Sequence, residues 1–200
     1  MIPTRKQAED ELEKANKLNP GLWKQHSINV GRAAEIIAEH CTDINADKAY
    51  IVGCLHDIGR RAGIVGVKHI IAGYDYAMGK GWDEAARVCL THSYPIQDVS
   101  KEIGKFDVTT DEYNRMNNIL NSMVYDDYDK LIILCDSLAM AEGFVILEKR
   151  FVDTTRRYGM FDFTVERWNA VIAIKEYFEN KMGCSIYDIL PNIKETTFKI

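Results

Sequence analysis

Histidine and aspartate are the residue types in this sequence whose positions could support chemistry. Six of them lie in or at the end of expected helices and have apolar neighbours: His26, His56, Asp57, His69, His92 and Asp136. A polar side chain on a buried face is costly unless a partner pairs with it. Neutral imidazole and carboxylate are ligand types that iron, manganese, nickel and zinc accept, so a divalent cation is the simplest partner common to all six.

Each of these residues also has a structural interpretation. A single histidine in a helical pattern is more often a hydrogen-bonded core or surface residue than a metal ligand. His40 illustrates the point, because it lies 14 residues after His26 on the same expected helix. At about 1.5 Å per residue the two imidazoles are roughly 21 Å apart, so both cannot bind one metal. His40 is therefore left out of the candidate site.

Two cysteines lie close to the candidate ligands and need the same test. Cys54 precedes His56 by two residues, and about 200° of helical rotation turns it away from the site. Cys89 precedes His92 by three residues, so about 300° of rotation leaves it on nearly the same face. A buried free cysteine commonly packs as a small hydrophobe, and we favour that role for both.

Composition narrows the function classes. The chain has 200 residues with 25 Lys and Arg against 30 Asp and Glu, for a net charge of −5. An overall negative chain does not attract a phosphate backbone, which argues against nucleic-acid binding. The five cysteines are odd in number and lack a CxxC pair, which favours reduced thiols over disulfides or a zinc finger. No window approaches the roughly 18 apolar residues of a membrane span, so we expect a soluble cytoplasmic protein.

Helical periodicity dominates the chain and predicts an all-α, single-domain helical bundle. Thr4 and Gln7 form a capping-box pattern ahead of a peripheral helix, and only four prolines interrupt the rest. No clean period-2 segment indicates a strand. The expected helices, listed by residue number, are 4–18, 22–40, one from about 45 or 47 to 59, 68–78, 83–92, 111–123, 128–143, and a late helix carrying Val165, Trp168, Val171, Ile172 and Phe178.

Three motifs in order resemble those of the HD-domain superfamily of metal-dependent phosphohydrolases. They are "WKQHSINVGRAAEIIAEH", "VGCLHDIGRR" and "LIILCDSLAMAEG". In that family the first His, the His-Asp doublet and the late Asp bind one metal, which implies His26, His56, Asp57 and Asp136 as ligands here. The resemblance covers residues 22–143 as the HD core of a single 1–200 domain, with an N-terminal helix at 4–18 and a helical extension at 144–200.

Two further motifs resemble the branch of the family that binds two metals. "VKHIIAGYDYA" supplies His69 and "VCLTHSYP" supplies His92, and in that branch the doublet Asp bridges both ions. Their spacing is similar to that of small nucleotide-cleaving members. The chain lacks the paired histidines and the Gly-Tyr-Pro signature of the cyclic-di-GMP subgroup, so that substrate is not carried over. The implied cofactors are two divalent ions, such as iron, manganese or another transition metal.

The implied activity is cleavage of a phosphate ester or anhydride in a small nucleotide-like substrate through a metal-bound hydroxide, with Asp57 as the central catalytic residue. Arg60, Arg61 and Lys68 are placed to bind an anionic substrate. For Arg61 and Lys68 a solvated cation near a helix end is an equally good interpretation. The resemblance implies a small-molecule phosphate partner, while the net charge and the lack of a long apolar segment argue against nucleic acid and membrane as partners.

Two other functions stay open at the level of sequence. A minority of two-metal HD proteins are diiron oxygenases with the same ligand set, and a non-catalytic nucleotide-binding module could retain the fold. The extension at residues 144–200 is expected either to cover the site or to form a homodimer surface. The sequence does not choose between these roles.

Overall fold

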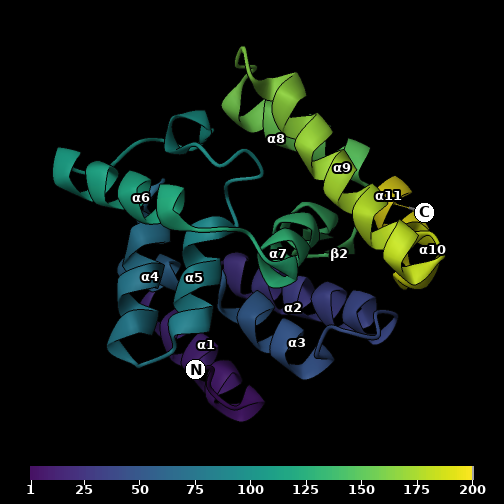
Figure 1. The fold of residues 1–200 in the computed structure, drawn as a ribbon, viewed down its shortest axis with the longest axis horizontal. Helices are drawn as coiled ribbons and strands as arrows, with labels where there is room; N and C mark the ends of the chain where they lie inside the picture. The colour runs from purple at the N-terminus through teal and green to yellow at the C-terminus, as the bar shows by residue number, and fades with distance from the viewer. Residues whose placement is uncertain (200) are drawn as a thin grey trace.

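The computed structural model describes residues 1–199 and consists mostly of helices, which confirms the all-α expectation (Figure 1). Two short strands form one antiparallel pair, Ala139 with Phe144 and Met140 with Gly143. The elements, in chain order, are α1 Arg5–Leu18, α2 Trp23–Glu39, α3 Ala46–Leu55, the 3₁₀ helix η1 Ile58–Ala62, α4 Lys68–Gly79, α5 Asp83–Thr91, the 3₁₀ helix η2 Val99–Lys101, α6 Thr110–Ser122, α7 Asp127–Leu138, β1 Ala139–Met140, β2 Gly143–Phe144, α8 Leu147–Tyr158, α9 Thr164–Met182, α10 Ile186–Ile189 and α11 Ile193–Phe198.

Capping side chains begin the helices where the sequence predicts them. Thr4 accepts a hydrogen bond from the amide of Gln7 and completes a capping box at the start of α1. Asn45 caps α3 through the amide of Lys48. Each cap satisfies an amide that has no partner within the helix, which fixes the first residue of the helix. Among residues 1–199, no helix has the length and apolar character needed to cross a membrane.

Three sequence expectations differ from the structure. The third helix ends at Leu55 rather than Gly59, and the His56–Asp57 doublet occupies the turn before η1. The helix expected at 128–143 ends at Leu138, because the chain then turns through the β1–β2 pair. On α9 the expected apolar stripe is only partly buried, since Val165 is 56% exposed while Val171 is 3% exposed.

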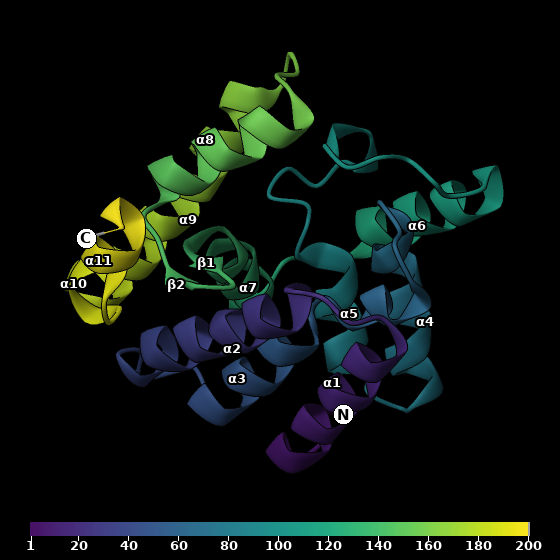
Figure 2. The ribbon, with the colours of Figure 1, turned by 180° about the vertical axis from the view of Figure 1, so that it is seen from behind.

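Helix α7 lies at the centre of the molecule, as both faces show (Figures 1 and 2). Helices α4, α5 and α6 lie on one side of it, and α8 to α11 lie on the other. The middle of α7 is apolar on nearly every side, and Leu131, Ile132 and Leu134 are all fully buried. A helix that is apolar all round belongs in a core, so α7 is the element on which both sides pack.

Two glycines allow α2 and α3 to approach each other closely. A Cβ at Gly31 of α2 would meet the Cys54 sulfur at 2.6 Å, and a Cβ at Gly53 of α3 would meet the Gly31 Cα at 2.7 Å. Such contacts are well inside van der Waals separation, so neither position has room for a side chain. This close crossing brings the beginning of α2, which carries His26, near the end of α3, which precedes the His-Asp doublet.

Candidate metal centre and substrate pocket

The structure brings the six candidate ligands together from five separate segments. His26 lies in α2, His69 in α4 and Asp136 in α7, while His56 and Asp57 follow α3 and His92 follows α5. One group that could hold an ion consists of His26, His56 and Asp57, whose ligand atoms all lie within 4.8 Å of one another. Asp136 adjoins this group, with its Oδ1 at 2.8 Å from His26 Nε2 and 4.0 Å from His56 Nε2.

A second group shares Asp57 with the first. It consists of Asp57, His69 and His92, again with ligand atoms within 4.8 Å of one another. Asp57 Oδ1 lies 3.2 Å from His69 Nε2 and 3.7 Å from His92 Nε2. His56 Nε2 approaches the other Asp57 oxygen, Oδ2, at 3.8 Å. The two carboxylate oxygens of Asp57 therefore face different histidines.

Backbone carbonyls fix the orientation of three of the imidazoles. The Nδ1 atoms of His56, His69 and His92 lie 2.7, 2.5 and 2.9 Å from the carbonyl oxygens of Gly53, Gly66 and Cys89. A carbonyl oxygen can only accept, so Nδ1 carries the proton in each ring. The Nε2 atom of each neutral ring is left with a lone pair directed into the site, which is the arrangement found in metal-binding histidines.

The atoms that face one another in this cluster are acceptors without donors. Among residues 1–199, His56 Nε2, Asp57 Oδ1 and His69 Nε2 are buried and have no hydrogen-bond partner. Unpaired buried acceptors are costly, and acceptors that face one another also repel. Cations held by the two groups that share Asp57 would satisfy these acceptors. The residues present therefore fit one or more metal ions, with imidazole nitrogen and carboxylate oxygen as the donor set.

Electrostatics hold these groups in the protonation states that metal binding requires. Burial lowers the pKa of His92 to about 3, and the neighbouring His56 adds to the effect. Burial likewise lowers the pKa of His56 despite the opposing charges of Asp57 and Asp136. Burial alone would raise the pKa of Asp57, but Arg60 and the adjacent imidazoles hold that pKa well below its usual value. His56 and His92 are therefore neutral and Asp57 is ionised at neutral pH.

Asp136 is also held ionised. Burial raises its pKa, but the hydrogen bond from His26 and the charge of Arg150 outweigh burial and lower the pKa far below its ordinary value.

Of the three cations expected to bind substrate, only Arg60 lines the pocket. Its Nε donates to Asp57 Oδ2. Arg61 instead places its guanidinium over the Tyr76 ring, 4.1 Å from the ring centroid. Lys68 pairs with Glu112 at 3.2 Å. The side chains of Arg61 and Lys68 thus lie away from the pocket, because each finds a nearer partner on the surface.

The residues excluded by the sequence reasoning lie outside both groups. His40 ends α2, is exposed, and directs Nδ1 to the Ile36 carbonyl at 2.9 Å. Cys54 is buried in the interior. Cys89 is also buried, and its sulfur donates to the Leu55 carbonyl at 3.2 Å. The last contact shows a packing role for Cys89 even though rotation alone does not separate it from His92.

Hydrogen bonds from outside the cluster hold the ligand-bearing segments in place. Asp107 accepts from the amides of Gly66 and Lys68 at 2.6 and 2.8 Å and so fixes the beginning of α4. On the opposite side, a Cβ at Gly59 would meet the His69 carbonyl oxygen at 1.9 Å. Only a glycine therefore allows η1 to pack on α4 closely enough for Asp57 to reach His69.

A buried ion pair connects α5 with α7. Asp129 of α7 is fully buried and accepts from Arg87 Nε at 3.0 and 2.9 Å through both carboxylate oxygens. Thr91, immediately before His92, donates to Asp129 at 2.8 Å. This bridge sets the position of the end of α5 relative to α7, and hence the position of His92 relative to Asp136.

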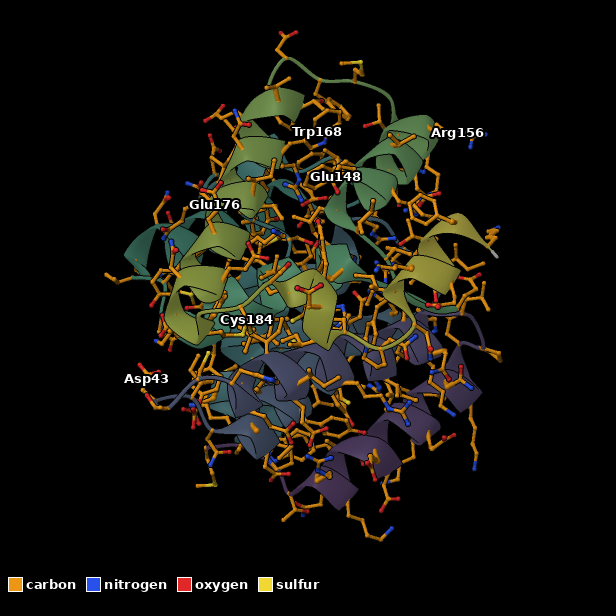
Figure 3. The ribbon with its side chains drawn as sticks, turned by 90° about the vertical axis from the view of Figure 1, so that its right-hand side faces the viewer. Asp43, Glu148, Arg156, Trp168, Glu176 and Cys184 are labelled. Carbon is orange, nitrogen blue, oxygen red and sulfur yellow. The ribbon has the colours of Figure 1, made fainter. Side chains whose placement is uncertain are left out.

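The cluster opens into a pocket of about 780 Å³. Helices α2, α4 and α7 and the segments after α3 and α5 form one side of the pocket, which we call the core wall. Helices α8 and α9 form the other side, which we call the C-terminal wall. Trp168 of α9 lies on the side of that helix that faces α8 (Figure 3). Its ring stacks on Phe151 of α8, with ring centroids 5.3 Å apart.

The C-terminal wall contains pocket residues that the sequence reasoning did not identify. Arg150 lines the pocket from α8, and its Nη2 lies 3.6 Å from Asp136 Oδ1. Arg167 of α9 donates to the carbonyls of Ser93 at 2.7 Å and Lys101 at 3.1 Å, which ties α9 to the segment that follows His92. The sequence offers no signal for either role, because Arg150 and Arg167 resemble any other arginine on a surface helix.

Comparison with protein families identifies a domain in the first part of the chain. Residues 4–81 match the model of the HDOD domain, which is related to the HD domains. The matched part runs from α1 to the end of α4 and contains His26, His56, Asp57 and His69. His92, Asp136 and the whole C-terminal wall lie beyond it. No curated protein and no solved structure matches the chain.

Proposed function

We propose that the protein is a metal-dependent phosphohydrolase that cleaves a phosphate ester or anhydride in a small nucleotide-like substrate. The observation that supports the proposal is that the unpaired buried acceptors of His56 and His69 belong to two ligand groups that share Asp57. Their donor set suits transition-metal ions, and the site opens into a pocket large enough for a small organic ligand. The match to an HD-related domain supports the same proposal.

Divalent cations held by these residues would activate water and stabilise the charge that develops on a transferring phosphoryl group. In the proposed site, Asp57 would contribute to both ligand groups. The neutral state of His56 and His92 leaves the positive charge of the cations available for substrate oxygens. Arg60, at the pocket edge, holds the orientation of Asp57.

The test uses the full chain with each of several divalent ions and a panel of nucleotides and phosphate esters. The proposal predicts that at least one substrate releases phosphate or nucleotide and that Asp57→Asn lowers this rate by at least about 10³-fold, or about 4 kcal/mol in activation free energy. Asp188→Asn is the matched control, because Asp188 is exposed on α10 and outside the pocket. It should retain the full rate.

Three results would contradict the proposal. Full activity in Asp57→Asn would remove Asp57 from the chemistry. Substrate loss coupled to oxygen consumption, without phosphate release, would instead identify an oxygenase. Binding of a nucleotide with no turnover under any of the ions would identify a non-catalytic module.

A further inference from the structure

Arg150 differs from the other arginines of the pocket in having no hydrogen bond for its guanidinium. Within the described part of the chain, its nearest carboxylates are Asp136 at 3.6 Å and Asp153 at 3.9 Å, both beyond hydrogen-bond length. Its side chain is only 20% exposed. A guanidinium carries five donors in a planar fork, and a mostly buried one is normally paired.

Two other arginines that line the pocket have hydrogen-bond partners within the protein. Arg60 donates to Asp57, and Arg167 donates to two backbone carbonyls. Both have structural partners that hold ligand-bearing segments in place. The unused donors of Arg150 are therefore free for a different kind of partner, one that enters the pocket.

The position of Arg150 defines the chemistry of that partner. Its guanidinium lies beside Asp136, at the border between the C-terminal wall and the candidate metal centre. When Asp136 shares its charge with a cation, its attraction for Arg150 weakens. The guanidinium would then be available to an anion in the pocket, and its planar fork suits the paired oxygens of a phosphoryl group.

We infer that Arg150 of α8 binds a phosphoryl oxygen of a ligand held at the candidate metal centre, so that the C-terminal wall completes the substrate site. This inference rests on the proposed function and names the residue that recognises its substrate. Phe151, which follows Arg150 in the chain, and Trp168 stack on each other on the same wall. The ligand class is a phosphate ester whose organic group occupies the rest of the pocket.

The test measures inorganic phosphate binding to the manganese-loaded full chain by isothermal titration calorimetry. Arg150→Gln should weaken phosphate binding at least tenfold, and Arg150→Lys, which keeps a charge without the fork, should fall between. Arg156→Gln is the matched control. Arg156 lies on the same helix but at its outer edge (Figure 3), and it lines a separate groove. Its phosphate affinity should equal that of the wild type.

A parallel titration with manganese alone separates substrate binding from a structural role. If Arg150 only positions Asp136, Arg150→Gln loses manganese affinity along with phosphate affinity, and the inference is overturned. If it binds phosphate, manganese affinity stays the same or rises, because a nearby positive charge has been removed. Phosphate affinity within twofold of the wild type in Arg150→Gln, or no phosphate binding by the wild type, also overturns the inference.

These outcomes are distinct from those of the activity test. Phosphate binding that depends on Arg150 without turnover of any substrate would leave the anion site in place and contradict the hydrolase proposal. Turnover that is insensitive to Arg150→Gln would support the hydrolase proposal and contradict the role of Arg150.

Discussion

The two walls of the pocket satisfy their polar groups in opposite ways. On the core wall, His56, Asp57 and His92 are 1%, 3% and 3% exposed, and backbone carbonyls fix the histidine rings. On the C-terminal wall, Arg150 keeps its donors free. The core wall thus presents fixed acceptors that suit a cation, whereas Arg150 on the C-terminal wall presents a positive charge that has ion-pair partners but no hydrogen bond.

This difference separates two tasks. Groups that must hold a cation need a rigid framework with fixed protonation states, because small displacements of the ligand atoms weaken binding. Groups that receive an organic substrate can lie on a helix pair connected to the framework by a few contacts. The following predictions disturb each wall in turn, in order of decreasing effect.

Loss of the buried ion pair should affect the core wall most strongly. Asp129→Ala removes the buried carboxylate from the partly exposed Arg87 and from Thr91, so the free energy of unfolding should fall by about 3 kcal/mol. Urea denaturation measures the change. Glu176→Ala, at an exposed position of α9, should alter it by less than about 0.5 kcal/mol. Equal effects from both variants would show that α5 and α7 are not braced by this bridge.

Asp57 should matter more for metal binding than any single histidine, because it belongs to both ligand groups. Asp57→Asn should lower the affinity for both ions by at least about 100-fold, or about 2.7 kcal/mol. His69→Gln should lower the affinity only for the ion held by the group that contains His69 and His92. Titration calorimetry with manganese measures the number of ions and their affinities. Loss of both ions in His69→Gln would contradict the assignment of two groups.

Acid should destabilise the metal-free protein through its buried histidines. The unfolded chain takes up a proton on His92 as the pH falls through about 6.5, whereas the folded protein keeps a His92 pKa of about 3. Between these values the unfolded state binds more protons, so the free energy of unfolding decreases as the pH falls. From pH 6.5 to 4.5 this one group should contribute about 2 kcal/mol.

Denaturation at several pH values with a chelator present measures this dependence. His56 acts in the same direction, because its pKa is also lowered. His92→Gln should remove part of the decrease, while His40→Gln, at the exposed end of α2, should retain it. A pH-independent stability across this range would contradict the neutral, buried state of His92.

The C-terminal wall should tolerate substitution better than the core wall. Trp168→Leu removes the stacking on Phe151 and should lower the free energy of unfolding by about 1 kcal/mol. Because Trp168 lines the pocket and belongs to neither ligand group, manganese affinity should stay unchanged while the affinity for an organic phosphate falls. A parallel loss of manganese affinity would show that the two walls are not independent.

The sequence predicts the core wall far better than the C-terminal wall, for a physical reason. A histidine or aspartate framed by apolar residues is unusual, so positions such as His26 and Asp136 can be recognised without coordinates. Capping residues such as Thr4 and Asn45 likewise predict where helices begin. The sequence does not reveal that α3 ends at Leu55, where the His56 ring contacts the Gly53 carbonyl and the chain turns into η1, which packs against α4.

Arg150 shows the limit of this reasoning most clearly. It lies on the same amphipathic helix as Arg156 and Arg157. Periodicity alone gives none of these three arginines a special role. Only the tertiary position of α8 beside α7 places Arg150 next to Asp136. The same applies to Arg61 and Lys68, whose nearest partners, Tyr76 and Glu112, come from other parts of the chain.

Anomalous X-ray diffraction from crystals grown with manganese tests the central claim most directly, since it locates each ion independently of activity. The account predicts one anomalous peak bounded by His26, His56, Asp57 and Asp136 and a second bounded by Asp57, His69 and His92. Density that lacks both peaks, with the imidazole Nε2 atoms hydrogen-bonded to water or to protein donors, would contradict it.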